Sequence, residues 1–309
     1  MAENVISLSG LSIERLRSFC QIVEAGSAAA AAKRNSVLPG QLSRQIKDLE
    51  TSLGTKLFSK EGKHLKLTAG GMKLAALTNA YFAGLQELKE EEGNESRPMA
   101  LGAGDSVVRW LLVPRLAEVL VAAGGSVDIG THRTGAIIDR LESGQLDVGL
   151  IRSDAESDGL ERLTFPTVRY VLMVPRSVLP DKSAAGIKNI RLLPFIMLTG
   201  DGRFVRSAEL VAKSNGIALQ ARARVESFGL AVEAAKVLNA ATFVPTQAQN
   251  EFPAEQFTTV ALDGIDAMNR SLSVAFSKRT AELNTRARRF ALRLSRAYEG
   301  GAVSGRIST

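Results

Sequence analysis

Cysteine and histidine are scarce in this sequence of 309 residues, which holds one cysteine, Cys20, and two histidines, His64 and His132. A single cysteine cannot form a disulfide within the chain. The three residues lie far apart in sequence, so they make a poor ligand set for zinc and a poor basis for cysteine–histidine catalysis. We therefore expect neither a disulfide nor a metal site.

Long hydrophobic runs and nucleotide-binding motifs are missing as well. The longest apolar stretch, residues 110–123, is interrupted by Pro114, Arg115 and Glu118, and a membrane helix needs about 18 uninterrupted apolar residues. The first ten residues lack the basic and apolar segments of a secretion signal. Gly102-Ala103-Gly104 falls far short of a dinucleotide fingerprint, and no phosphate-binding loop of the P-loop type occurs. We expect a soluble, cytoplasmic protein with no membrane partner, no cofactor and no enzymatic activity.

The charge that is present is unevenly distributed. The chain carries a formal net charge of +7, and its length and 45% hydrophobic content suit two or three domains. Between residues 33 and 73, nine basic residues face only three acidic ones, which leaves +6. A basic segment of this kind suits a polyanion such as nucleic acid. A second basic cluster, at residues 278–296, is interpreted as a solvated helix face.

The first sixty residues predict three helices, over residues 11–24, 28–33 and 39–53. The third begins at Pro39, a residue that is favoured at the first helical position because its missing N–H would be unpaired there. One face of this helix is apolar, and the other is polar and basic. Two helices joined by a short turn, the second basic on its outer face, indicate a helix-turn-helix that inserts into the major groove. The alternative is an ordinary helical hairpin.

The residues after the third helix favour DNA binding over a plain hairpin. Basic and apolar residues alternate after Gly62, as expected of a small β-hairpin, or wing, that lies along the DNA backbone. Arg and Gln side chains reach base edges, whereas Ser and Lys reach phosphates. The expected DNA-binding residues are Pro39, Gly40, Gln41, Ser43, Arg44, Lys47, Lys63, His64 and Lys66.

These residues resemble a known family. The runs LSRQIKDLE at 42–50, Leu53-Gly54, Leu57-Phe58 and LTAGG at 67–71 are similar in order and spacing to the DNA-binding domain of LysR-type transcriptional regulators. The resemblance covers residues 11 to about 90. It implies a winged helix-turn-helix, a long linker helix that dimerises and a C-terminal effector-binding domain.

Residues 68–92 predict that linker helix, with Thr68 as its N-cap. Large apolar residues recur at helical spacing and nearly form a heptad seam: Leu74, Leu77, Tyr81, Leu85 and Leu88. The helix either packs on its own domain or forms a dimer seam, and a dimer matches the two half-sites of a palindromic operator. By the resemblance, the effector domains pair further, so the assembly is a homodimer or a homotetramer.

The last two hundred residues alternate between strand and helix patterns, as in parallel α/β sheets. Expected strands cover 99–102, 127–130, 146–151, 170–174, 195–198, 221–225, 242–244 and 274–276. The stretches LESGQLDVGL at 141–150 and SFGLAV at 227–232 resemble the effector domain of the same family, which has the fold of type 2 periplasmic binding proteins. The expected fold class is therefore α/β: a winged helix-turn-helix, a linker helix and a two-lobed periplasmic-binding-protein-like domain.

The domain boundaries follow from these patterns. We expect a DNA-binding domain at 1–68, a linker helix and hinge at 69–97, an effector-binding domain at 98–300 and a flexible tail at 301–309. Within the effector domain, lobe I comprises 98–164 and 268–300, and lobe II comprises 165–267.

Ligands of open α/β sheets bind at the carboxyl ends of strands, beside helix N-termini. By position, the expected effector-binding residues are Ser106, Arg133, Thr134, Thr199, Arg203 and Ser227. The two arginines suit a small anionic effector. Asp105 lies among them and would repel an anion unless it is paired.

The predicted function is a DNA-binding transcription regulator that responds to a small-molecule effector, with double-stranded DNA and RNA polymerase among its partners. Two alternatives remain open: a solute-binding protein, which has no use for residues 11–68, and an enzyme on the same two-lobed fold, which needs an acid–base pair in the cleft.

Overall fold

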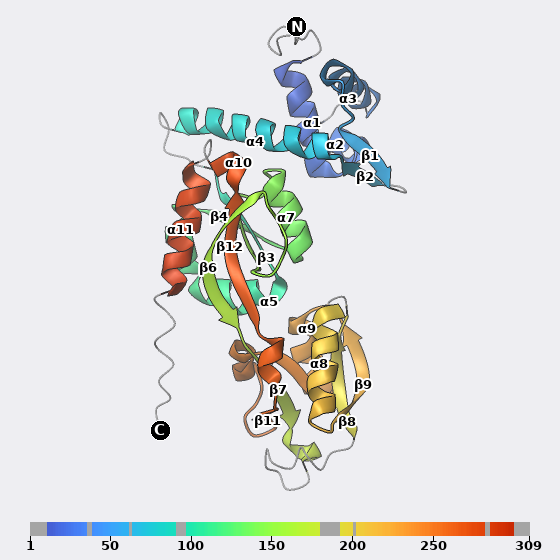
Figure 1. Ribbon diagram of the computed structural model, residues 1–309, viewed down its shortest axis with the longest axis vertical. Coiled ribbons are helices and arrows are strands. Elements are labelled where there is room, and N and C mark those ends of the chain that lie inside the picture. The colour runs from blue at the N-terminus through green and yellow to red at the C-terminus, as the bar shows by residue number, and fades with distance from the viewer. Residues whose placement is uncertain are drawn as a thin grey trace.

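The computed structural model describes residues 11–35, 39–61, 64–90, 97–179, 192–199, 202–281 and 285–299 (Figure 1). The expected tail at 301–309, most of the hinge after the linker helix and the wing-tip residue Lys63 lie outside these ranges. The fold class that the sequence predicts is confirmed, whereas the exact domain boundaries stay predictions.

The N-terminal unit is a three-helix bundle with a two-stranded hairpin. Its elements are α1 (Ile13–Ala25), α2 (Ala28–Asn35), α3 (Pro39–Leu53), β1 (Phe58–Glu61) and β2 (His64–Leu67). Ser12 caps α1 by accepting a hydrogen bond from the amide of Arg15 at 3.3 Å, and α3 is followed by Gly54 at a φ of 60°. The apolar stripe of α3 packs with Phe19 and Leu57 in a buried core.

Glu50 connects α3 to the hairpin. One carboxylate oxygen accepts hydrogen bonds from the amides of Leu57 at 2.9 Å and Phe58 at 3.4 Å, and the other accepts from Lys56 Nζ at 2.7 Å. Burial raises the pKa of the Glu50 carboxyl, but the hydrogen bonds and the charge of Lys56 outweigh it, so the pKa lies below its ordinary value. Glu50 therefore links the C-terminal part of α3 to the start of the wing by hydrogen bonds, in addition to their shared hydrophobic core.

The long helix α4 (Ala69–Glu90) leaves the hairpin and crosses the molecule (Figure 1). Thr68 caps it, accepting from the amide of Gly71 at 3.0 Å. Gly71 has to be a glycine at this approach, because a Cβ there would lie 2.1 Å from the carbonyl oxygen of Leu57. Leu74 packs into the N-terminal core, whereas Leu77, Tyr81 and Leu85 are exposed by 52%, 45% and 43%. The side chain of Leu88 lies outside the described part.

Lobe I is a five-stranded sheet covered by helices on both faces. Its strand order is β4-β3-β5-β12-β6, with β3, β4 and β5 parallel and β12 antiparallel to both of its neighbours. The strands are β3 (Met99–Ala103), β4 (Val127–Thr131), β5 (Val148–Arg152), β6 (Leu160–Val168) and β12 (Arg270–Ser277). The helical segments are α5 (Asp105–Val107), η2 (Val108–Leu112), η3 (Val113–Arg115), α6 (Leu116–Ala123), α7 (Thr134–Glu142), α10 (Lys278–Ala281) and α11 (Thr285–Glu299).

Lobe II contains two sheets that join at their edges. β10-β7-β11 is antiparallel and β8-β9 is parallel, and a bridge between Phe195 and Ala241 links the two sheets. The strands are β7 (Tyr170–Pro175), β8 (Leu192–Leu198), β9 (Ala218–Val225), β10 (Thr242–Pro245) and β11 (Phe257–Val260). The helical segments are η4 (Arg176–Val178), α8 (Gly202–Ser214), α9 (Phe228–Leu238), η6 (Thr246–Glu251) and η7 (Ile265–Met268).

Two strands in this domain had no counterpart in the sequence-based prediction. β6 and β11 alternate buried and exposed residues only partly, and β6 carries Pro166 within it. β6 pairs antiparallel with β12, and β11 pairs antiparallel with β7. Their strand conformation therefore depends on pairing with these neighbours more than on a pattern in their own residues. The other expected strands are observed, but the expectation of parallel sheets holds only in part, because β7 and β10 pair antiparallel and β12 is antiparallel to both of its neighbours.

The N-terminal unit and the linker helix contact lobe I directly. Asn79 Nδ2 of α4 donates to the carbonyl oxygen of Ser143 at 2.8 Å, and Gln145 Nε2 donates to the carbonyl oxygen of Val23 in α1 at 3.3 Å. These contacts connect the end of α7 to the N-terminal unit and the linker helix. None of the helices in the described ranges is long and apolar enough to cross a membrane.

The Glu50 contacts generate a pH-dependent prediction. Glu50→Gln should lower the free energy of unfolding at pH 7 by about 1 kcal/mol, because charge-assisted hydrogen bonds become neutral ones. A carboxyl whose pKa is lowered by folding stabilises the fold above its unfolded pKa, and this contribution is lost as the pH falls through the folded value. Urea unfolding of both proteins should therefore show a gap that closes below about pH 4. A gap that is constant from pH 7 to the acid range would contradict the assignment.

Candidate functional site

The exposed face of α3 carries the residues that sequence analysis assigned to DNA. Pro39, Gly40, Gln41, Ser43, Arg44 and Lys47 are all exposed. Ser43 donates its hydroxyl to the Pro39 carbonyl oxygen at 3.0 Å, and the side chains of Gln41, Arg44 and Lys47 have no hydrogen bond or ion pair with the described residues. Lys66 is exposed on β2, while the side chain of His64 lies outside the described part. The polar side chains at the centre of this face are therefore available to a partner.

The other face of α3 shows where polar residues are instead used for structure. Gln45 Oε1 accepts from Ser18 Oγ at 2.6 Å, and Asp48 pairs with Arg15 of α1 at 3.1 Å. These contacts fix the orientation of α3 on α1. They also remove Gln45 and Asp48 from the set that could contact DNA.

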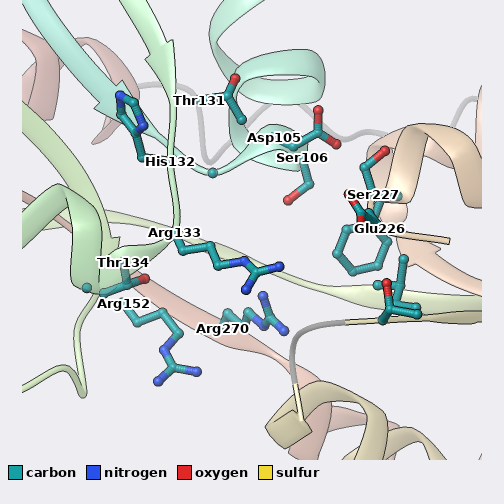
Figure 2. Close-up of a pocket in the computed structure, with 15 residues that line it drawn as sticks. Asp105, Ser106, Thr131, His132, Arg133, Thr134, Arg152, Glu226, Ser227 and Arg270 are labelled. Carbon is teal, nitrogen blue, oxygen red and sulfur yellow. The ribbon is translucent and has the colours of Figure 1, made fainter. Parts of the chain in front are cut away.

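A second site is a cavity of about 600 Å³ between the lobes (Figure 2). It is lined by Gly104, Asp105, Ser106, Thr131, His132, Arg133, Thr134, Gly135, Arg152, Leu198, Thr199, Glu226, Ser227, Phe228 and Arg270. Most of these residues follow a strand and begin a helix or a turn: β3 leads into α5, β4 into α7, β8 into the turn at Thr199, and β9 into α9. The fold therefore gathers strand ends and helix N-termini around one cavity.

The predicted effector residues fall in this cavity, with one exception. Ser106, Arg133, Thr134, Thr199 and Ser227 line it, whereas Arg203 does not. Arg203 lies in the first turn of α8, where it pairs with Asp154 of lobe I and lines a neighbouring cavity of about 260 Å³. Its guanidinium therefore joins the lobes at this position instead of facing the main cavity.

Besides Asp105, three charged residues of the cavity were not among the predicted effector-binding residues. Arg152 ends β5, so its place after a strand could have identified it. Glu226 directly precedes Ser227 in the turn into α9 and could have been found by the same reasoning. Arg270 begins the returning strand β12, so the rule for carboxyl ends of strands does not point to it.

The charges in the cavity are held in different ways. Arg270 lies over the rings of Phe204 and Tyr170, at 4.9 and 5.7 Å from their centroids. Arg152 Nε lies 3.3 Å from Asp154 Oδ1. Arg133 and Glu226 are exposed and form no ion pair with any residue in the described ranges. The Asp105 Oδ2 atom is buried and, within the described structure, accepts no hydrogen bond.

His132 adds no positive charge to this set at neutral pH. Burial lowers its pKa, and the nearby charge of Arg140 lowers the pKa further. The imidazole is therefore neutral, and the cationic part of the cavity is made by arginines.

The lobes are also joined on the side of α5 and α9. Glu251 of η6 accepts from Arg109 Nη2 at 2.7 Å and from the indole nitrogen of Trp110 at 2.6 Å. Trp110 is 7% exposed, so its N–H has little access to water and depends on Glu251. This contact and the Arg203–Asp154 pair hold the lobes together at two separate positions.

Comparison with known protein families covers nearly the whole chain. The family described as "Bacterial regulatory helix-turn-helix protein, lysR family" matches residues 13–72, and "LysR substrate binding domain" matches residues 92–298. The chain belongs to the LysR family of transcriptional regulators.

Individual relatives are distant. The regulator TtuA of Agrobacterium vitis is 29% identical over 49% of this chain, which spans 51% of TtuA. A probable hydrogen peroxide-inducible genes activator of Mycobacterium leprae is 24% identical over 72% of this chain and 73% of its own length. The matched region thus covers about half the length of TtuA.

Solved structures share the fold. The LysR family regulator CbnR superimposes with a TM-score of 0.60 at 20% identity, covering 93% of this chain and 99% of CbnR. ArgP from Mycobacterium tuberculosis gives a TM-score of 0.62 at 19% identity, covering 91% of this chain and 98% of ArgP. At these identities the likeness concerns the fold alone.

The Glu251 contact between the lobes generates a stability prediction. Glu251→Ala should lower the free energy of unfolding by about 1–3 kcal/mol, because the buried indole N–H of Trp110 loses its acceptor. Lys236→Ala is the control: it removes an ion pair within α9 and should change the stability by less than about 0.5 kcal/mol. Equal stabilities of the two variants in urea unfolding would show that the Glu251 contact does not hold the lobes together.

Proposed function

We propose that this LysR-family protein binds operator DNA through α3 and the wing, and that a small molecule bound between the lobes regulates this activity. The observation that carries the DNA-binding part is the exposed face of α3. Gln41, Arg44 and Lys47 project from one helix without partners in the described structure, which is the arrangement that a major groove can use. Ser43, Lys63, His64 and Lys66 are the proposed contacts to the DNA backbone.

The proposed effector site is the cavity between the lobes. Ser106, Arg133, Thr134, Thr199 and Ser227 surround it, and Arg133 can bind an anionic group of the effector. A ligand there contacts both lobes at once, so it has different affinities for arrangements in which the lobes are closer or further apart. That difference is what a regulator needs, because a ligand that binds two arrangements equally shifts neither.

The proposed assembly is a homodimer or homotetramer. Leu77, Tyr81 and Leu85 lie four residues apart on one exposed face of α4, which supports a helix-to-helix contact between copies. Val121 of α6 and Val237 of α9 are exposed by 75% and 82%, which supports a second contact between effector domains. The proposed location is the cytoplasm and the proposed further partner is RNA polymerase, because a regulator of this kind acts on promoter DNA.

We do not propose peroxide sensing for this protein, although the name of the mycobacterial relative refers to hydrogen peroxide. A thiol reacts with peroxide as the thiolate, which requires a low pKa and access to solvent. Cys20 is buried in α1, and burial together with the charge of Glu24 raises the pKa of its thiol to about 12. Its Sγ donates to Asn79 Oδ1 at 3.4 Å, so the residue has a packing role between α1 and α4.

The α3 face generates the first functional prediction. On a DNA fragment that the wild-type protein selects from a genomic pool, Arg44→Ala should weaken binding by about 1–3 kcal/mol and relax the sequence preference. Lys66→Ala should weaken binding to all sequences and lower the salt slope by about one. Arg222→Ala, an exposed arginine on β9, serves as the control and should leave both quantities unchanged. Mobility-shift titrations in which Arg44→Ala matches wild type would remove that residue from the interface.

The exposed face of α4 generates a second functional prediction, which concerns the assembly. In the full chain, replacing Leu77 and Leu85 with Asp should halve the assembly mass, because two charges would be buried in an apolar contact. Leu210→Asp is the matched control, since Leu210 is 67% exposed on α8 and outside this face. Sedimentation analysis that gives the same mass for the double variant and for wild type would place the dimer contact elsewhere.

A further inference from the structure

The cavity between the lobes carries charges of both signs on different sides (Figure 2). Figure 2 shows Arg133 and Arg270 on one side, and Asp105 and Glu226 on the other. We infer that the effector is a zwitterion, a small molecule with a carboxylate and an ammonium group, such as a free amino acid. This inference rests on the proposed function and names the chemical class of its ligand.

The carboxylate subsite lies at the beginning of α7. Arg133 is the N-cap residue of this nine-residue helix, and its guanidinium has no ion pair within the described structure. The hydroxyl of Thr134 lies in the same turn and lines the cavity. Arg270 extends toward Arg133 in Figure 2 and is held by its stacking on Tyr170 and Phe204. A carboxylate placed here can accept charge-assisted hydrogen bonds from a guanidinium.

The ammonium subsite lies where α5 and α9 begin. Glu226 is exposed to the cavity and pairs with no cation among the described residues. Asp105 adds a second carboxylate whose Oδ2 atom lacks a hydrogen-bond donor there. Ser227 Oγ accepts from the amide of Leu230 at 3.2 Å, so this hydroxyl caps α9 and still has a lone pair for a donor. An ammonium group with three N–H donors satisfies such a set of acceptors.

A purely anionic ligand fits this cavity poorly. Its second negative group would face Glu226 and Asp105, and neither carboxylate has a cationic partner in the described structure that would neutralise it. Arg152 does not neutralise these two carboxylates, because it lies beside Asp154, which also pairs with Arg203, and its guanidinium points away from Glu226 and Asp105 in Figure 2. The carboxylate subsite belongs to lobe I and Glu226 to lobe II, so a zwitterion also bridges the lobes by charge. Phe228 and Leu198 offer an apolar wall for the rest of the ligand.

The test uses the full-length protein and a panel of standard protein amino acids, each with two derivatives. The N-acetyl derivative lacks the ammonium group, and the primary amide lacks the carboxylate; succinate is the dianionic probe. Calorimetric titration should find at least one amino acid that binds. Both of its derivatives, and succinate, should bind at least about tenfold more weakly, since each lacks one charge-assisted contact.

Two variants assign the charges to residues. Glu226→Gln should weaken binding of the amino acid by about ten- to a hundredfold and leave binding of its N-acetyl derivative unchanged. Arg133→Gln should weaken both the amino acid and its N-acetyl derivative but leave the amide unchanged. Glu161→Gln and Arg222→Gln, which neutralise exposed residues outside the cavity, are matched controls. Unchanged melting temperatures of the free variants would show that folding is intact.

Two results would overturn the inference. In the first, N-acetyl derivatives or succinate bind as tightly as the amino acids, and Glu226→Gln does not weaken the binding of any ligand. The cavity is then an anion site, and the proposed function stands. The other is that no amino acid binds at about 10 mM. If succinate and the N-acetyl derivatives also fail to bind, the effector role of the cavity is lost together with the inference.

Discussion

The chain crosses between the two lobes twice, at residues 168–170 and 269–270, and the position of the cavity depends on these crossings. They lie side by side: the amide of Tyr170 donates to Asn269 Oδ1 at 3.3 Å, and the guanidinium of Arg270 lies over the ring of Tyr170. Adjacent crossings of this kind form a hinge about which two lobes can rotate. The residues that follow β3 and β4 in lobe I therefore line the same cavity as those that follow β8 and β9 in lobe II.

A single helix, α7, connects the cavity between the lobes to the DNA-binding unit. α7 begins at the cavity with Arg133 and Thr134 and ends near Ser143, whose carbonyl oxygen accepts the hydrogen bond from Asn79 of α4. Gln145, two residues further on, contacts α1. One helix thus connects the proposed carboxylate subsite to the linker helix. A change in the position of α7 would therefore act on α4 and α1 together.

The sequence predicted the DNA-binding unit more completely than the effector site. Stripes such as Leu42, Ile46 and Leu49 depend on residues close in sequence, so helical spacing alone identified α3 and its exposed face. The effector cavity combines turns from both lobes, and the rule for strand ends found most of them. It did not place Arg203, because its pairing with Asp154 depends on how the lobes meet. It also did not find Arg270, because that residue starts a strand that returns from lobe II. Contacts that depend on the arrangement of distant segments leave no periodic pattern in the sequence.

The most direct test of the account is selection of genomic DNA fragments by the full-length protein at about 150 mM salt, followed by footprinting of the enriched fragments. The account predicts enrichment of related sequences with two protected half-sites, separated by about 10 base pairs or a multiple of one helical turn, because a dimer presents two copies of α3. Retention of all fragments alike, with loss of binding as salt rises and no defined footprint, would contradict it.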